Sequence, residues 1–110
     1  MPGSLEAFLI EPASENSLGE LYTTRTSHHQ SDRKIAWDYS ELKYQYFFRP
    51  ILDRIARHAP NRVLLDVGCS NGAFVNAASN HGWQASGIDL ETGSVEIARS
   101  RGLAVRNGRL

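Results

Sequence analysis

Two aspartates and two glycines have the types and the spacing of a nucleoside-binding site. Asp66 and Gly68 lie in the stretch LLDVGCSNGAF, residues 64–74, which also contains Gly72, and Asp89 follows 21 positions after Gly68. Glycines permit a tight turn between a strand and a helix, and an acid at the end of the next strand can accept hydrogen bonds from both hydroxyls of a ribose. The pattern therefore predicts a nucleoside ligand.

The loop also indicates which kind of nucleoside it fits. In the dinucleotide fingerprint G-x-G-x-x-G/A, the second glycine lets the backbone approach a pyrophosphate. Aligning Gly68 with the first glycine places Ser70 at the second position and Ala73 at the third, so the phosphate-approach position fails. The phosphate loop G-x-x-x-x-G-K-[ST] is absent as well. We expect a nucleoside cofactor without phosphates, whose amino-acid tail carries an ammonium that needs an acid or carbonyls nearby.

The elements that must position these residues alternate along the chain. Residues 63–67 form a near-continuous apolar run typical of a buried parallel strand, and the run WQASGID predicts a second strand. Helices are predicted over 73–80, ended by Gly82, and over 92–101, capped by Thr92 and closed by Gly102. With LAVRNG beginning a third strand, the prediction is an incomplete α/β Rossmann-like, doubly wound parallel sheet of about three strands.

The part of the chain before this sheet divides into two segments. Residues 1–34 show no sustained period and are interpreted as irregular or flexible, whereas 37–59 has a helical apolar stripe with Pro50 at a first turn. We therefore place one domain at 35–110, with a helical lead-in at 37–59 and the cofactor-binding region at 63–110. The aromatic stretch YSELKYQYFF is interpreted as a helix docking on the sheet; the alternative is that Tyr39, Tyr44 or Tyr46 closes over a ligand.

Composition excludes few classes of protein. The chain has 110 residues, 41% of them hydrophobic, and its twelve basic residues balance twelve acidic ones, so charge gives no argument for nucleic acid or an anionic membrane. Cys69 is the single cysteine, and no signal peptide or membrane span is evident, so we expect a cytoplasmic protein. The neighbouring His28 and His29 lack further ligands at suitable spacing, and no metal site is predicted.

The stretch VLLDVGCSNGAFVNAASNHGWQASGIDLETGSVEIARSRGL resembles the first half of a class I S-adenosylmethionine-dependent methyltransferase. In that family a D-x-G-x-G-x-G-like loop follows the first strand and an acid ends the second. The resemblance covers roughly residues 45–106 and rests on several spaced features. It implies S-adenosyl-L-methionine as the cofactor and methyl transfer as the reaction.

The resemblance also implies roles for single residues. The loop positions match the family's cofactor loop, in which Gly68 and its neighbours face the methionine part of the cofactor, while Asp89 meets the ribose and Leu90 lies against the adenine. The chain departs from the family at Ser70, where glycine is frequent, and at Arg109, where many members carry an acid near the adenine edge. The predicted cofactor-binding residues are Asp66, Gly68, Cys69, Ser70, Gly72, Asp89 and Leu90.

The acceptor and its catalytic base are not predicted, because in the resembled family the residues facing the acceptor mostly follow the third strand. We expect the chain to be the amino-terminal part of a methyltransferase, with little activity alone. Without a fourth strand, the run at 63–67 would present a bare apolar edge through which copies of the chain could associate.

Two other classes of function remain open at this point. A non-catalytic interaction module would keep the fold, pair through the bare edge and not bind the cofactor. An oxidoreductase dependent on NAD or FAD would share the sheet and the ribose acid, although Ser70 argues against it.

Overall fold

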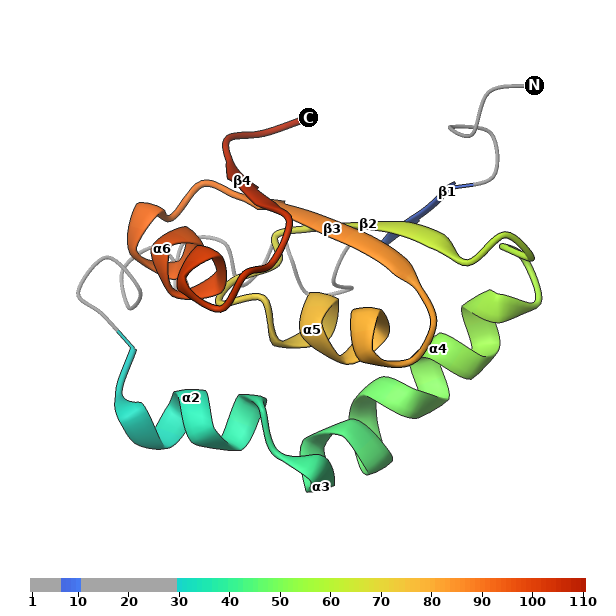
Figure 1. Ribbon diagram of the computed structural model, residues 1–110, viewed down its shortest axis with the longest axis horizontal. Helices are drawn as coiled ribbons and strands as arrows, with labels where there is room; N and C mark the ends of the chain where they lie inside the picture. The colour runs from blue at the N-terminus through green and yellow to red at the C-terminus, as the bar shows by residue number, and fades with distance from the viewer. Residues whose placement is uncertain (1–6, 11–29) are drawn as a thin grey trace, which may run out of the picture.

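The computed structural model describes residues 7–10 and 30–110 and contains one parallel sheet (Figure 1). Neighbouring strands pair in the order β1-β2-β3-β4, all in the same direction. Their carboxyl ends therefore share one edge of the sheet, where ligands of such sheets bind. The strands are β1 (Ala7–Ile10), β2 (Val63–Val67), β3 (Gln84–Asp89) and β4 (Val105–Asn107).

The described helices lie on one face of the sheet, below it in Figure 1. With the parallel sheet they form the predicted incomplete Rossmann-like α/β fold, which has four strands where about three were expected. The helical elements are α2 (Asp32–Asp38), α3 (Glu41–Lys43), the π-helical turn η2 (Tyr44–Phe48), α4 (Arg49–Ala56), α5 (Ala73–Asn80) and α6 (Thr92–Ser100).

Strand β1 corrects two expectations about the beginning of the chain. Ala7–Ile10 pairs with the outer edge of β2 in parallel, with Ala7 opposite Val63 and Ile10 opposite Asp66. The edge at 63–67 is therefore covered, and the predicted self-association through it is wrong. The segment 1–34 is also not irregular throughout, because it contains β1 and the start of α2; residues 1–6 and 11–29, including His28 and His29, lie outside the described residues.

The core lies between the sheet and the helix layer and consists of two clusters of buried apolar side chains. One cluster joins α4 and α5 to β2, and the other joins α5 and α6 to β4. Apolar burial of this kind is the main stabilising contribution to a fold. The first cluster comprises Leu52, Ile55, Ala59, Leu64, Phe74, Ala78 and Trp83, and the second Cys69, Val75, Val95, Ala98 and Val105.

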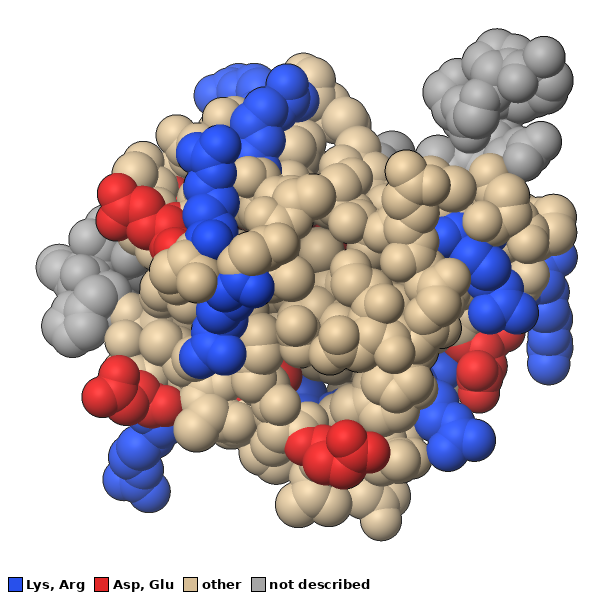
Figure 2. All heavy atoms as spheres, in the orientation of Figure 1, with Lys and Arg blue, Asp and Glu red and all other residues tan. Residues whose placement is uncertain are grey.

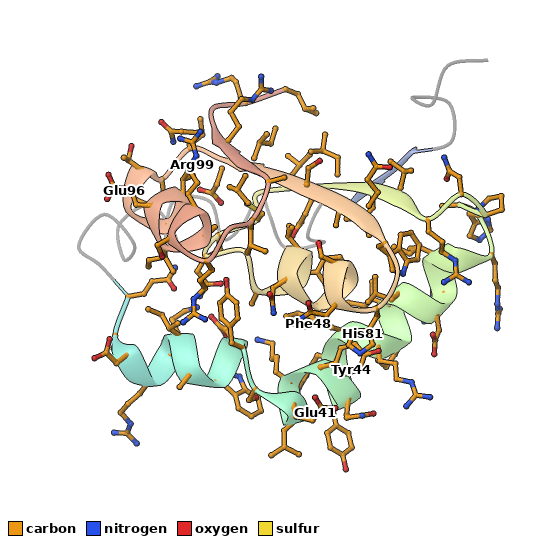
Figure 3. All side chains as sticks on the ribbon, viewed as in Figure 1. Glu41, Tyr44, Phe48, His81, Glu96 and Arg99 are labelled. Atoms are coloured by element: carbon orange, nitrogen blue, oxygen red, sulfur yellow. The ribbon has the colours of Figure 1, made fainter. Side chains whose placement is uncertain are left out.

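The aromatic stretch before α4 packs on α5, so it docks on a helix that covers the sheet and not, as expected from the sequence, on the sheet itself. Phe48 meets the ring of Phe74 edge-on at 5.2 Å, and Tyr44 stacks on His81 with ring centroids 4.0 Å apart (Figure 3). Tyr46 is 72% exposed and takes no part in this packing. The lead-in is thus fixed to the helix that starts at the glycine loop.

Helix ends follow the sequence closely, with one correction. Pro50 stands in the first turn of α4, and Gly82 follows α5 at φ +92°, as predicted. The cap of α6 is Glu91, whose carboxylate accepts from the backbone N–H of Gly93 at 2.9 Å, and not Thr92, which is the first helical residue. A carboxylate at this position accepts a hydrogen bond from an otherwise unpaired helix amide, and the positive end of the helix dipole stabilises its charge.

Candidate cofactor site

The glycine loop 68–72 connects the carboxyl end of β2 to α5. Gly68 and Gly72 adopt φ values of +79° and +85°, in the left-handed region that glycine enters without strain. A Cβ on Gly72 would lie 2.8 Å from both Ala98 Cβ and Leu103 Cδ1. Both the backbone conformation and the packing against α6 therefore require glycine at position 72.

Four of the five backbone amides of this loop are bonded within the protein. Gly68 N and Cys69 N both donate to the carbonyl of Ile88, at 2.8 and 3.0 Å, and Gly72 N donates to the carbonyl of Cys69 at 3.0 Å. Ser70 N donates to Asp89 Oδ2 at 2.8 Å. A phosphate-binding loop instead aims its amides at the ligand, so this loop lacks that chemistry at these four amides.

Asp89 ends β3 and is held in place from both sides. Its Oδ1 accepts from the backbone N–H of Glu91 at 2.8 Å, and its carbonyl accepts from Asn107 Nδ2 at 3.0 Å. Each carboxylate oxygen has a second acceptor position left, since an ionised carboxylate offers about four. The adjacent Leu90, which the resemblance places against the adenine, is 64% exposed.

Asp66 is a buried acid, and no described residue donates a hydrogen bond to its carboxyl group. It lies at the carboxyl end of β2 and is 6% exposed. Burial, together with the neighbouring charge of Asp89, raises the pKa of Asp66 to about 7. An ionised carboxylate in this position has no compensating cation among the described residues.

Cys69 is placed differently from the other loop residues. Its side chain is buried in the core cluster with Val75, and it fits there because residue 87 is glycine: a Cβ on Gly87 would lie 2.7 Å from Cys69 Sγ. Burial and the charges of Asp66 and Asp89 raise the pKa of the thiol to about 12. The side chain of Cys69 therefore packs as an apolar group.

Three polar residues at this site were not predicted from the sequence. Asn71 is 2% exposed, and its Oδ1 accepts from the backbone N–H of Ala73 at the start of α5 at 3.1 Å. Its Nδ2 donates to Gln30 Oε1 at 2.7 Å and to Asp38 Oδ2 at 2.9 Å. No local pattern marks these contacts, because their partners are more than thirty positions apart.

Tyr39 and Asp38 fasten the lead-in to the loop. Tyr39 donates its hydroxyl to the carbonyl of Asn71 at 2.6 Å, and the guanidinium of Arg101 lies 4.0 Å from the centre of the Tyr39 ring. Burial raises the pKa of Tyr39 to about 12, so the hydroxyl remains a donor at neutral pH. Of the three tyrosines considered for ligand closure, Tyr39 thus contacts the loop itself.

The described residues show neither a group of three or more metal-ligating side chains nor a helix long and apolar enough to span a membrane.

Arg109 is exposed. On the face drawn in Figure 2, basic side chains form a strip over α6 and β4, and acidic side chains lie near the margins. The balanced total charge is thus distributed unevenly on this face.

No family model matches the chain. Curated proteins do: the ubiquinone biosynthesis O-methyltransferase of Chromobacterium violaceum is 38% identical over 71 residues, which are 61% of this chain and 31% of that protein. The protein of the same name from Bordetella avium is 36% identical over 72 residues, which are 61% of this chain and 30% of that protein.

Sheet, loop and comparisons together confirm the resemblance to class I methyltransferases. Within that class, the chain is similar to the ubiquinone biosynthesis O-methyltransferases of the two organisms. The match spans less than a third of the length of these relatives.

Proposed function

We propose that this chain binds S-adenosylmethionine and is the cofactor-binding part of a methyltransferase that acts on oxygen. The observation that carries the proposal is the buried Asp66 beside Asp89, to whose carboxyl group no described residue donates, at the carboxyl end of two neighbouring parallel strands. The names of the two relatives support oxygen as the acceptor atom.

Each residue has one binding task in this proposal. Asp66 accepts the ammonium of the cofactor's amino-acid tail, and the remaining acceptor positions of Asp89 take the ribose hydroxyls. Leu90, which is 64% exposed, covers one face of the adenine. The bound cofactor supplies an electrophilic methyl carbon on a sulfonium, so the task of these residues is to hold that carbon in line with an acceptor oxygen.

Two features favour this cofactor over a dinucleotide. Four amides of the glycine loop are bonded to protein acceptors, which leaves no cradle at those amides for a pyrophosphate. The fingerprint position for phosphate approach is Ser70, whose own side chain is engaged by Gln30. A pyrophosphate would also bring negative charge next to two carboxylates, whereas the tail of S-adenosylmethionine brings an ammonium.

The test is a calorimetric titration of the full chain with S-adenosylhomocysteine, 5′-methylthioadenosine and NAD. Methylthioadenosine keeps the adenosine and lacks the amino-acid tail, so it is a matched control for Asp66. We expect S-adenosylhomocysteine to bind most tightly, NAD not to bind, and Asp66→Asn to weaken S-adenosylhomocysteine alone. Binding of NAD in preference would contradict the proposal, as would no binding of any of the three.

A further inference from the structure

Gln30 links the glycine loop to the start of α6. The side chain is 8% exposed, and its Nε2 donates to Ser70 Oγ at 3.0 Å and to Ser94 Oγ at 3.1 Å. Its Oε1 accepts from Asn71 Nδ2 at 2.7 Å. Both amide hydrogens and the amide oxygen of Gln30 are thus engaged, which is the expected state of a buried amide.

The direction of these hydrogen bonds is fixed by Asp38. An ionised carboxylate only accepts, so the group of Asn71 that faces Asp38 Oδ2 at 2.9 Å must be its NH2. The same NH2 then also donates to Gln30, which turns the NH2 of Gln30 toward the two serines. Asp38 is kept ionised by Lys34 and Lys43, whose ammonium groups lie 2.6 and 3.2 Å from its oxygens.

In this arrangement, no described residue accepts a hydrogen bond from the Ser70 hydroxyl. Because Ser70 Oγ accepts from Gln30, its own O–H must be directed elsewhere, and no described residue accepts it. Ser70 is half-buried, has φ +54°, and donates its backbone N–H to Asp89. Among the described residues, the Ser70 hydroxyl is therefore a donor without an acceptor, and it lies in the loop that follows Asp66, whose carboxyl group receives no hydrogen bond from these residues.

We infer that the Ser70 hydroxyl donates a hydrogen bond to the carboxylate of the cofactor's amino-acid tail, and that Gln30 is the positioning residue that presents it. The inference rests on the proposed function. The tail carries its ammonium and its carboxylate on one carbon, so a loop that binds the ammonium at Asp66 brings the carboxylate close to its own donors. Glycine at position 70 lacks this donor, and the contact is specific to the serine of this chain.

The test uses two ligands that differ only in the carboxylate: S-adenosylhomocysteine and its decarboxylated analogue, which keeps the ammonium. Ser70→Gly relieves the φ of +54° and removes the donor, and Gln30→Met keeps the side-chain length and removes the amide. We expect each variant to weaken S-adenosylhomocysteine about tenfold, as for a hydrogen bond to a charged group, and the analogue less than twofold. The double variant should bind like Ser70→Gly alone.

Gln45→Met is the matched control, because Gln45 is an exposed glutamine whose side chain, among the described residues, bonds to Glu41 and Arg49. It should change neither affinity. Equal losses for both ligands would show a general distortion of the loop and overturn the inference, as would unchanged affinities in Ser70→Gly. If Gln30→Met does not fold, as judged by its amide NMR spectrum, Ser70→Gly decides the outcome. A wild-type chain that binds neither ligand overturns the proposed function as well, which distinguishes the two failures.

Discussion

Two buried aspartates of this chain have opposite surroundings. Asp38, 8% exposed, accepts from two lysine ammonium groups and from Asn71, whereas Asp66, 6% exposed, has no described donor and a second acid nearby. Burial alone raises the pKa of Asp38, but the hydrogen bonds from Lys34, Asn71 and Lys43 lower it more, and the net pKa lies below its ordinary value. The pKa of Asp66 rises to about 7.

The difference separates an acid that stabilises the fold from an acid that we propose binds the cofactor ammonium. Ionisation of Asp38 stabilises the folded chain, since the cations and donors around it are part of the chain. For Asp66, ionisation destabilises the folded chain, and a bound cation would make the ionised form favourable. Binding sites commonly retain such unfavourable groups, which the rest of the fold must offset.

The largest effect is expected from Asp38→Asn. The amide keeps the volume but leaves two ammonium groups without a counter-charge and offers Asn71 a weaker acceptor. Since the lysines are partly exposed and screened, we expect the free energy of unfolding at pH 8 to fall by about 2–3 kcal/mol. Denaturant titration measures it, with Asp53→Asn, an exposed acid 3.9 Å from Arg49, as the control that should change it little.

The same substitution at Asp66 should have the opposite sign. A group whose folded pKa is raised adds stability below its unfolded pKa and loses that stability as the pH rises through about 7. Asp66→Asn removes the buried charge but adds an amide without described partners, so we expect a gain of about 1–2 kcal/mol at pH 8. At pH 5 the gain should vanish. Destabilisation by both substitutions at pH 8 would break the comparison between the two acids.

A smaller effect is expected in the pH dependence of binding. Below about pH 7 a proton competes with the ligand ammonium for Asp66, so affinity for S-adenosylhomocysteine should rise about tenfold between pH 5.5 and 7.5. Calorimetry at several pH values measures it. In Asp66→Asn the rise should be absent, and 5′-methylthioadenosine should show none in either protein; a rise that persists in the variant would assign the titration to another group.

The smallest effect is expected at Leu90. The side chain is 64% exposed, so Leu90→Ala should leave stability within about 0.5 kcal/mol. Affinity for adenosine-containing ligands should fall about threefold to tenfold, because an apolar contact with the base is lost. Leu42→Ala, at another exposed leucine on α3, is the control that should leave affinity unchanged.

Local sequence patterns predicted the elements whose bounds depend on neighbouring residues. The strand at 63–67 and the helix at 73–80 have the predicted bounds, because a continuous apolar run and flanking glycines determine both. The start of α2 was missed, although Ser31 accepts from the backbone N–H of Lys34 as a capping serine does. That signal was available in the sequence.

Other features could not be predicted from one sequence. The four residues of β1 are too few for a period, and their partner strand lies far along the chain. The hydrogen bond between Gln30 and Asn71 likewise joins residues 41 positions apart. Polar residues in a polar stretch give no sign of burial, whereas the acid and glycine positions of the loop do follow a spacing that chemistry requires.

The pairing of β1 with β2 also has a consequence for how the chain acquires its structure. Strands β2, β3 and β4 are linked by single helices, so their pairings close short stretches of chain and can form early. Ala7–Ile10 leaves the ribosome long before Val63–Val67, its only partner among the described strands, is synthesised. We therefore expect β1, although it is made before β2, to join the sheet after β2, β3 and β4 have paired, with the outer edge of β2 open until then.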